Sequence, residues 1–113
     1  MERPRPVTID DLRRRIDELD EQLVRLLSER AVCVRQIGRL KQTLRMAIYQ
    51  PGREAEVLRR VRDAEAQLGG PLGPEAMARV FERIIDEARR IERDGAEDGH
   101  AAPTDGEDRD RRS

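Results

Sequence analysis

The most regular feature of the sequence is a stripe of apolar residues spaced at alternating intervals of three and four. It comprises Ile9, Leu12, Ile16, Leu19, Leu23, Leu26, Cys33, Ile37, Leu40 and Leu44. This spacing is a heptad seam, and it predicts one long amphipathic helix from Val7 to roughly Ala47. Cys33, the only cysteine, is expected to be a small buried apolar residue on that seam.

The start of this helix carries a recognisable signal. Thr8 is suited to cap the helix, and Asp11 stands three residues later, as a capping box requires. Val7 and Leu12 occupy the positions of a hydrophobic staple. We therefore expect residues 1–7 to form a flexible arm that ends where the helix begins.

Two shorter helices are predicted after the first. Pro51 suits the first turn of a helix that ends at the Gly69-Gly70-Pro71 segment. A third helix is expected to begin near Pro74. Residues 8–94 then form one all-α domain of three helices, and residues 95–113, which lack periodicity and contain His100, are expected to be a disordered charged tail without a catalytic role.

The length of the first helix favours a dimer. About 38 residues at 1.5 Å each span roughly 57 Å. A compact domain of about 95 residues has a radius of gyration near 12 Å, so such a helix extends beyond a monomeric globule. A second copy of the chain is expected to cover the exposed seam.

Composition excludes several classes of protein. Charged residues make up 42% of the chain with a net charge of −1, and its aromatic residues are Tyr49 and Phe81. Balanced charge and few aromatics argue against nucleic-acid binding and against β-sandwiches. No apolar run is long enough to span a membrane, and the N-terminus lacks a signal-peptide core, so we expect a cytoplasmic protein. No metal-ligand spacing or phosphate-binding loop is present, and no cofactor is expected.

Three cations lie on or beside the apolar seam. Arg30 takes a seam position, while Arg13 and Lys41 each follow a seam leucine by one residue. Arg30 and Lys41 are eleven residues apart, so they share a helix face and can converge on one small anion from about 16 Å. Arg13 is rotated by about 100° from Arg30 and can serve a partner's pocket in a dimer.

Further charges fall on the other two helices. Arg53 and Glu54 open the second helix, and Glu92 lies on the expected inner face of the third. Such cations and carboxylates favour a small, doubly anionic ligand with a hydroxyl or an ether. An alternative stays open for each: a buried Arg–Glu pair for Arg30, a helix-dipole carboxylate for Glu54, and ordinary surface ion pairs for the other cations.

The ordered sequence resembles the all-helical chorismate mutase family, in its monofunctional form, over about residues 8–93. The matching stretches are Leu12-Arg13-Arg14-Arg15-Ile16-Asp17, Leu19-Asp20-Glu21, Leu26-Leu27-Ser28-Glu29-Arg30, Ile37-Gly38-Arg39-Leu40-Lys41, Tyr49-Gln50-Pro51-Gly52-Arg53-Glu54 and Phe81-Glu82-Arg83-Ile84-Ile85. The order and spacing of the cations make this resemblance specific.

The resemblance implies an intertwined homodimer with active sites shared between chains and with chorismate as the substrate. Arg13 from the partner and Arg30 would hold the substrate carboxylates. Lys41 would bridge a carboxylate and the ether oxygen, and Glu92 would be the second donor to that oxygen. The implied reaction is the Claisen rearrangement to prephenate, which needs no nucleophile, metal or cofactor.

The same resemblance assigns the ring end of the substrate. Glu54 would accept a hydrogen bond from the ring hydroxyl, and Arg53 would support the anion-binding field. Gln50 stands where many members have Asp, and Ala88 replaces a frequent Ser. These differences leave a 4-amino-4-deoxychorismate mutase or an isochorismate pyruvate lyase as alternatives, and a non-catalytic helical dimerisation or regulatory module as an alternative from another class.

Overall fold

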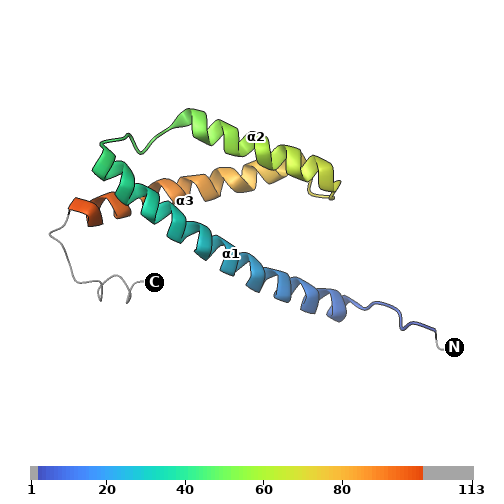
Figure 1. Ribbon diagram of the computed structural model, residues 1–113. Helices are drawn as coiled ribbons and strands as arrows, with labels where there is room; N and C mark the ends of the chain where they lie inside the picture. Colours follow the sequence, from blue (N-terminus) through green and yellow to red (C-terminus); the bar gives the residue numbers. More distant parts are fainter. Residues whose placement is uncertain (1–2, 101–113) are drawn as a thin grey trace. The chain divides into compact units, whose positions relative to one another are not determined.

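The computed structural model describes residues 3–100, and the side chains of residues 3–98. Within this range the chain forms three helices and no strand (Figure 1): α1 (Ile9–Leu44), α2 (Pro51–Leu68) and α3 (Pro74–His100). The predicted all-α class with one very long first helix is confirmed. No helix in this part of the chain combines the length and the apolar character needed to cross a membrane.

The first helix ends three residues earlier than predicted. Arg45 adopts a positive φ of 57°. The amide of Met46 donates to the carbonyl of Lys41 at 2.8 Å, and the amide of Arg45 donates to the carbonyl of Gln42 at 3.2 Å. These two bonds form a Schellman motif, which closes the helix although no glycine is present.

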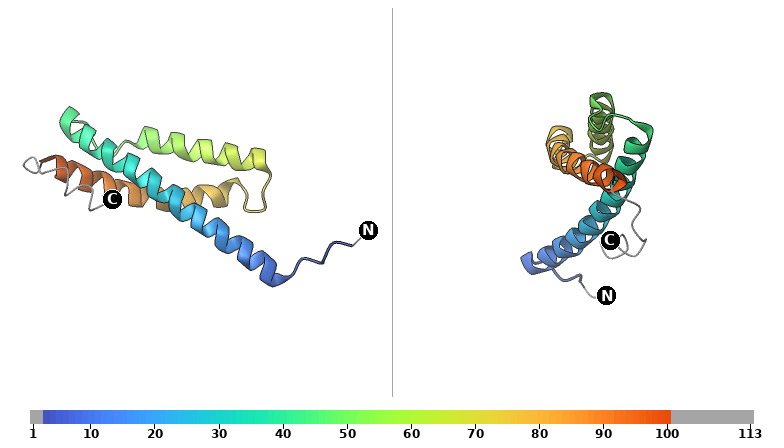
Figure 2. Two further views of the ribbon diagram at one scale, coloured as in Figure 1. Left: turned by 60° about the horizontal axis from the view of Figure 1, so that its bottom comes forward. Right: turned by 90° about the vertical axis from the view of Figure 1, so that its left-hand side faces the viewer.

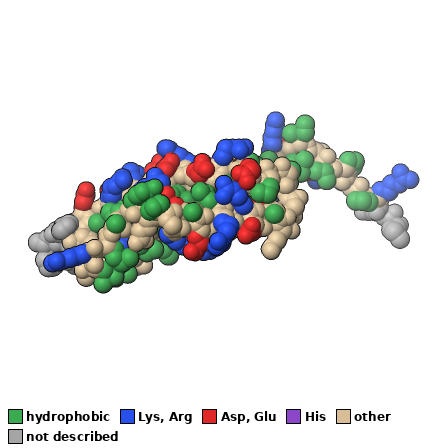
Figure 3. All heavy atoms as spheres, turned by 90° about the horizontal axis from the view of Figure 1, so that it is seen from above, with side chains coloured by type: hydrophobic (Ala, Val, Ile, Leu, Met, Phe, Trp, Pro, Cys, Tyr) green, Lys and Arg blue, Asp and Glu red, His purple; other side chains and the backbone are tan. Residues whose placement is uncertain are grey.

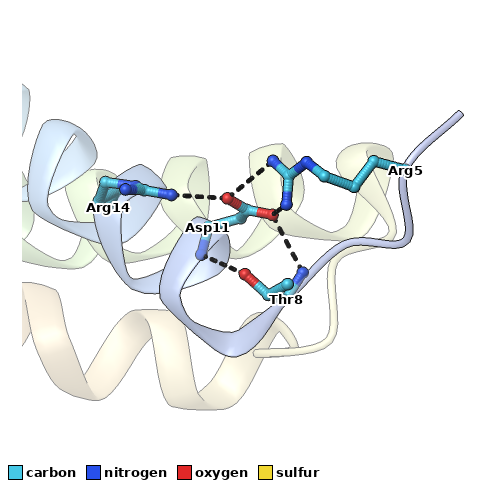
Figure 4. Close-up of polar contacts among 4 residues, drawn as sticks. All are labelled: Arg5, Thr8, Asp11 and Arg14. Carbon is cyan, nitrogen blue, oxygen red and sulfur yellow. Dashed lines mark hydrogen bonds and ion pairs between the residues drawn. The ribbon is translucent and has the colours of Figure 1, made fainter.

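The chain divides into two compact units, residues 1–31 and residues 32–113. The N-terminal unit contains the arm and the first part of α1. Its predicted capping box is present: the Asp11 amide donates to Thr8 Oγ1, and the Thr8 amide donates to Asp11 Oδ2, both at 3.1 Å (Figure 4). Arg5 and Arg14 also contact the Asp11 carboxylate, at 2.8 and 2.7 Å.

The apolar side chains of the N-terminal unit are exposed. Five residues of its seam are between 39 and 60% exposed: Leu12, Ile16, Leu19, Leu23 and Leu26. Val7, at the first staple position, is 71% exposed, and the arm is connected to the helix by polar contacts with Asp11. This unit therefore presents an apolar stripe along a helix whose start is fixed by hydrogen bonds.

In the C-terminal unit, α2 and α3 lie side by side and run antiparallel (Figure 2). Gly69 ends α2 in the left-handed conformation at φ 64°, as the sequence predicted. The turn is stabilised from inside by Glu65, which is 5% exposed and accepts the Gly73 amide at 2.9 Å. Buried apolar residues form a small core: Val34, Ala78 and Ile85.

Two glycines allow the last part of α1 to approach α3 closely. A Cβ added at Gly38 would overlap the backbone carbonyl of Glu92, and a Cβ added at Gly95 would overlap the carbonyl of Arg35. Helix backbones approach this closely only where side chains are absent. Cys33 is exposed in the same unit, so its predicted burial is wrong within one chain.

The predicted start of the disordered tail is also wrong. α3 continues through Gly95 to His100. The Asp98 carboxylate lies 2.9 Å from the Arg35 guanidinium and 3.8 Å from that of Arg39, and these contacts hold the last turns of α3 against α1. The remainder of the predicted tail, residues 101–113, lies outside the described residues.

Candidate functional site

The centre of the site is an ion pair between α1 and α3. Lys41 Nζ lies 2.8 Å from Glu92 Oε2 and donates a second hydrogen bond to the Ile48 carbonyl at 3.1 Å. The two charged side chains are only 9 and 15% exposed. Lysine has three N–H donors, so one remains for a ligand after these two bonds. The predicted inward position of Glu92 is confirmed.

The local sequence explains how Lys41 reaches this position. Gly38 lies almost one turn before Lys41 on α1 and lets the α1 backbone meet that of Glu92. The chain then leaves α1 at Arg45 and returns toward Lys41, so that the Ile48 carbonyl accepts from it. A buried cation costs free energy unless it is paired, and here both a carboxylate and a carbonyl compensate it.

A second ion pair joins the start of α2 to α3. Arg89 donates from Nε to Glu54 Oε2 at 2.8 Å and from Nη2 to Glu54 Oε1 at 2.5 Å. The guanidinium also lies 5.5 Å from the centre of the Tyr49 ring and 2.9 Å from Asp86 Oδ1. The hydrogen bonds from Arg89 hold the pKa of Glu54 below its ordinary value, with a smaller contribution from the charge of Lys41.

Arg89 was missed by the sequence interpretation. It follows Ala88 directly, but a single arginine among many on α3 carries no signal of its own. The relevant signal was the α2–α3 hairpin: Glu54 and Arg89 stand about equally far from the turn that follows Leu68. An antiparallel pairing of the two helices places such residues opposite each other.

The remaining residues predicted at the ring end lie around this pair in different ways. Gln50 is half-buried and precedes α2, where its side chain makes no capping bond. Ala88 is half-buried on α3. Arg53 instead is exposed and pairs with Glu56 one turn along α2, at 2.6 Å. The structure therefore places Arg53 on the surface of α2, because a local carboxylate is available there.

Two of the predicted cations belong to the N-terminal unit. Arg13 is exposed on α1, whereas Arg30 is partly buried. Their contribution to a site shared between chains remains a prediction. Among the described residues, no group of three His, Cys, Asp or Glu side chains is placed to hold a metal ion.

Comparisons with known proteins identify the family of the chain. Residues 12–93 match the protein family described as chorismate mutase type II. The chain is 43% identical over 90 residues to a bifunctional chorismate mutase/prephenate dehydratase of Neisseria gonorrhoeae. The aligned stretch covers 76% of this chain and 24% of that protein. The chain is 42% identical over 86 residues to the protein of the same description in Pseudomonas aeruginosa, covering 72% of this chain and 23% of that protein.

A further relative has a different description. The chain is 35% identical over 83 residues to a T-protein of Enterobacter agglomerans, covering 74% of this chain and 22% of that protein. The chain thus spans about a quarter of the length of the curated relatives that it matches. No solved structure gives a significant match.

Proposed function

Because the chain belongs to the type II chorismate mutase family, we propose that it rearranges chorismate to prephenate. The observation that carries this proposal is the buried Lys41, held by Glu92 and the Ile48 carbonyl with one N–H left to donate. The rearrangement is unimolecular. The protein can accelerate it by holding a compact reactive conformer and by stabilising negative charge on the breaking C–O bond.

Lys41 supplies that charge stabilisation. Its ammonium is fixed before the substrate arrives, so little reorganisation is needed at the ether oxygen. Glu92 has a second task in the proposal, as another donor to the same oxygen. A carboxyl group donates only when protonated, whereas an amide donates at every pH. Glu92→Gln is therefore expected to keep activity, and a loss of activity in this variant would contradict this role.

The substrate carboxylates are assigned to Arg30 and to Arg13 of a second copy. An exposed apolar stripe on the N-terminal unit, described above from Leu12 to Leu26, supports a homodimer because such a stripe is stabilised when a second copy covers it. Sedimentation should then show a dimer at micromolar concentration. A folded 13.0 kDa species alone would contradict the dimer.

Complementation tests the shared site directly. Arg13→Ala and Arg30→Ala subunits are each expected to be inactive as homodimers. In a mixed dimer, one site receives both intact arginines while the other lacks both, so activity should return. Confirmed mixed dimers that remain inactive would show that the two arginines do not serve one site from different chains.

Substrate identity is tested by offering alternatives in parallel. Chorismate, isochorismate and 4-amino-4-deoxychorismate are incubated separately with the chain, and the products are identified. Prephenate from chorismate is the expected main product, and two of the relatives above carry chorismate mutase in their description. A chain that turns over only one of the other two compounds would replace this proposal with the matching alternative, and a chain inert to all three would favour a non-catalytic module.

A further inference from the structure

The Glu54–Arg89 pair differs from the other arginine pairs of α3. Arg83 and Arg90 each contact Glu87, within one turn of the same helix, and both arginines are more than 60% exposed. Arg89 instead reaches across to α2 with two hydrogen bonds, and the paired side chains are 21 and 32% exposed. A planar guanidinium bound through two nitrogens fixes both the position and the charge of the carboxylate.

In this geometry Glu54 can still accept a hydrogen bond, but its negative charge is neutralised by Arg89. A carboxylate has about four lone-pair sites, and Arg89 occupies one on each oxygen. The others can still accept a hydrogen bond from a hydroxyl. An ammonium in the same place would instead lie beside the Arg89 guanidinium, which carries the same charge and would repel it. The positive charge of Lys41 also acts on Glu54.

No other side chain assigned to this end of the site restores a negative charge. Gln50 is neutral. Asp86 contacts the Nη1 edge of Arg89, but it is 51% exposed, so solvent screens it more strongly than Glu54. The cationic and anionic groups at the start of α2 therefore cancel, and a neutral ring substituent fits this balance better than a cationic one.

On the basis of the proposed function, we propose that Arg89 is a specificity-determining residue that selects a ring hydroxyl over a ring ammonium. It acts through Glu54, which it orients and neutralises, and so it is a positioning residue rather than a catalytic one. The substrate class that follows is a cyclic dicarboxylate with an uncharged hydrogen-bond donor on the ring.

The test compares two substrates, chorismate and 4-amino-4-deoxychorismate, by the ratio of their kcat/KM values. The wild-type chain should favour chorismate. Arg89→Met removes the charge but keeps an apolar stem over Tyr49, so the ratio should shift by about tenfold toward the amino compound, as expected for removal of one nearby like charge. Arg89→Lys keeps the charge and should retain a ratio close to that of the wild type.

Two controls separate specificity from folding. Arg62 forms another pair between α2 and α3, with Glu75 at 3.1 Å. Arg62→Met removes that pair and should leave the substrate ratio unchanged. Arg89→Gln keeps a donor for Glu54 without the charge, and it replaces the methionine variant if the latter does not fold.

The outcomes distinguish this inference from the proposed function. A wild-type chain that does not convert chorismate overturns the proposed function, and with it the stated substrate class. The second outcome is a wild-type chain that converts chorismate, with a folded Arg89→Met or Arg89→Gln variant that keeps the wild-type ratio of kcat/KM values. That outcome overturns the role of Arg89 alone. A lysine variant that shifts as far as the methionine variant would also overturn it, because charge would then not be the cause.

Discussion

The two units of the chain satisfy their charges in different ways. Among the described residues of the N-terminal unit, the ion pairs join residues no more than six positions apart, such as Arg15 and Glu18. The C-terminal unit has local pairs as well, such as Arg53 with Glu56, but its Lys41 and Glu92 are 51 positions apart, and its Glu54 and Arg89 are 35 apart. Figure 3 shows how densely charged side chains of both signs cover the surface between exposed hydrophobic ones.

This difference separates charges that stabilise a helix from charges that can form a site. A pair within one or two turns stabilises that helix by a few tenths of a kcal/mol and places its groups on the surface. The Lys41–Glu92 and Glu54–Arg89 pairs between helices are largely withdrawn from solvent, and they fix groups from distant parts of the sequence relative to each other. Comparing matched substitutions of the two kinds tests whether this distinction holds.

The largest effect is expected for Lys41→Met. It removes the buried cation assigned to the ether oxygen, and kcat should fall by about 100- to 1,000-fold. Arg90→Met is the matched control, because Arg90 pairs locally with Glu87 and is 62% exposed, and it should leave kcat unchanged. Steady-state rates of prephenate formation measure both variants.

Stability must be separated from catalysis in that experiment. Lys41→Met leaves the Glu92 carboxylate buried without its partner, which destabilises a fold strongly. Adding Glu92→Gln removes the unpaired charge and should restore the melting temperature but not the rate. A double variant that recovered wild-type kcat would contradict the role of Lys41.

The next largest effect is expected where the α1 and α3 backbones meet. Gly38→Ala should lower the free energy of unfolding by about 2 kcal/mol, because the added Cβ overlaps the Glu92 carbonyl and forces the helices apart. Gly52→Ala is the control, since nothing lies within 4 Å of a Cβ added there. Urea unfolding measures the change in the free energy of unfolding for each variant, and the two changes should differ in sign or in size. Equal losses would show that the close approach of α1 and α3 at Gly38 does not cause the loss.

A smaller effect is expected for the last turns of α3. Asp98→Ala removes a carboxylate that contacts Arg35 and Arg39 on α1, and we expect a loss of about 1 kcal/mol. Asp94→Ala removes a carboxylate that pairs along α3 with Arg90 at 3.5 Å, and it should cost less than about 0.5 kcal/mol. Thermal unfolding measures the difference, and equal values would contradict the distinction between local pairs and pairs between helices.

The smallest effect concerns acid and the start of α1. Hydrogen bonds from Arg5, Thr8 and Arg14 hold the pKa of Asp11 well below its ordinary value. A lowered pKa in the folded state stabilises the helix above the ordinary Asp pKa of about 3.9, and this contribution is lost as the pH falls toward the lower folded value. Asp11→Asn should therefore increase amide exchange in the first turn at pH 7.

The matching observation comes at low pH. As the pH falls below about 4, the difference in exchange between the wild type and Asp11→Asn should shrink, because the wild-type carboxylate begins to bind a proton when the helix start is unfolded, which favours the unfolded start. Added salt should reduce the part of the difference that comes from Arg5 and Arg14. A difference that stays constant with pH would show that the charge of Asp11 does not stabilise the helix start.

Local chemistry allowed the boundaries of several elements to be predicted from the sequence. Thr8 with Asp11, Pro51 and Gly69 each act within a few residues of themselves, and each is confirmed where it was predicted. The inward position of Glu92 also followed from helix periodicity. These features depend on spacing along one helix, which the sequence contains directly.

The wrong predictions involve contacts between helices. Gly95 was placed at the start of the disordered tail, but it permits contact with the Arg35 carbonyl, and α3 continues past it. Arg89 was missed because its importance depends on which residue of α2 stands opposite. Each of these outcomes depends on the register between two helices.

The glycine contacts between α1 and α3 also determine what can change without harm to the site. Where side chains separate two helices, each substitution alters the spacing, and the chain must repack around it. At Gly38 and Gly95 the backbones meet directly, so the spacing is set by atoms that every amino acid shares. The apolar residues nearby can therefore differ in size while Lys41 and Glu92 stay within reach of each other. Substitutions that accumulate in the small core then leave the geometry of the charged pair unchanged.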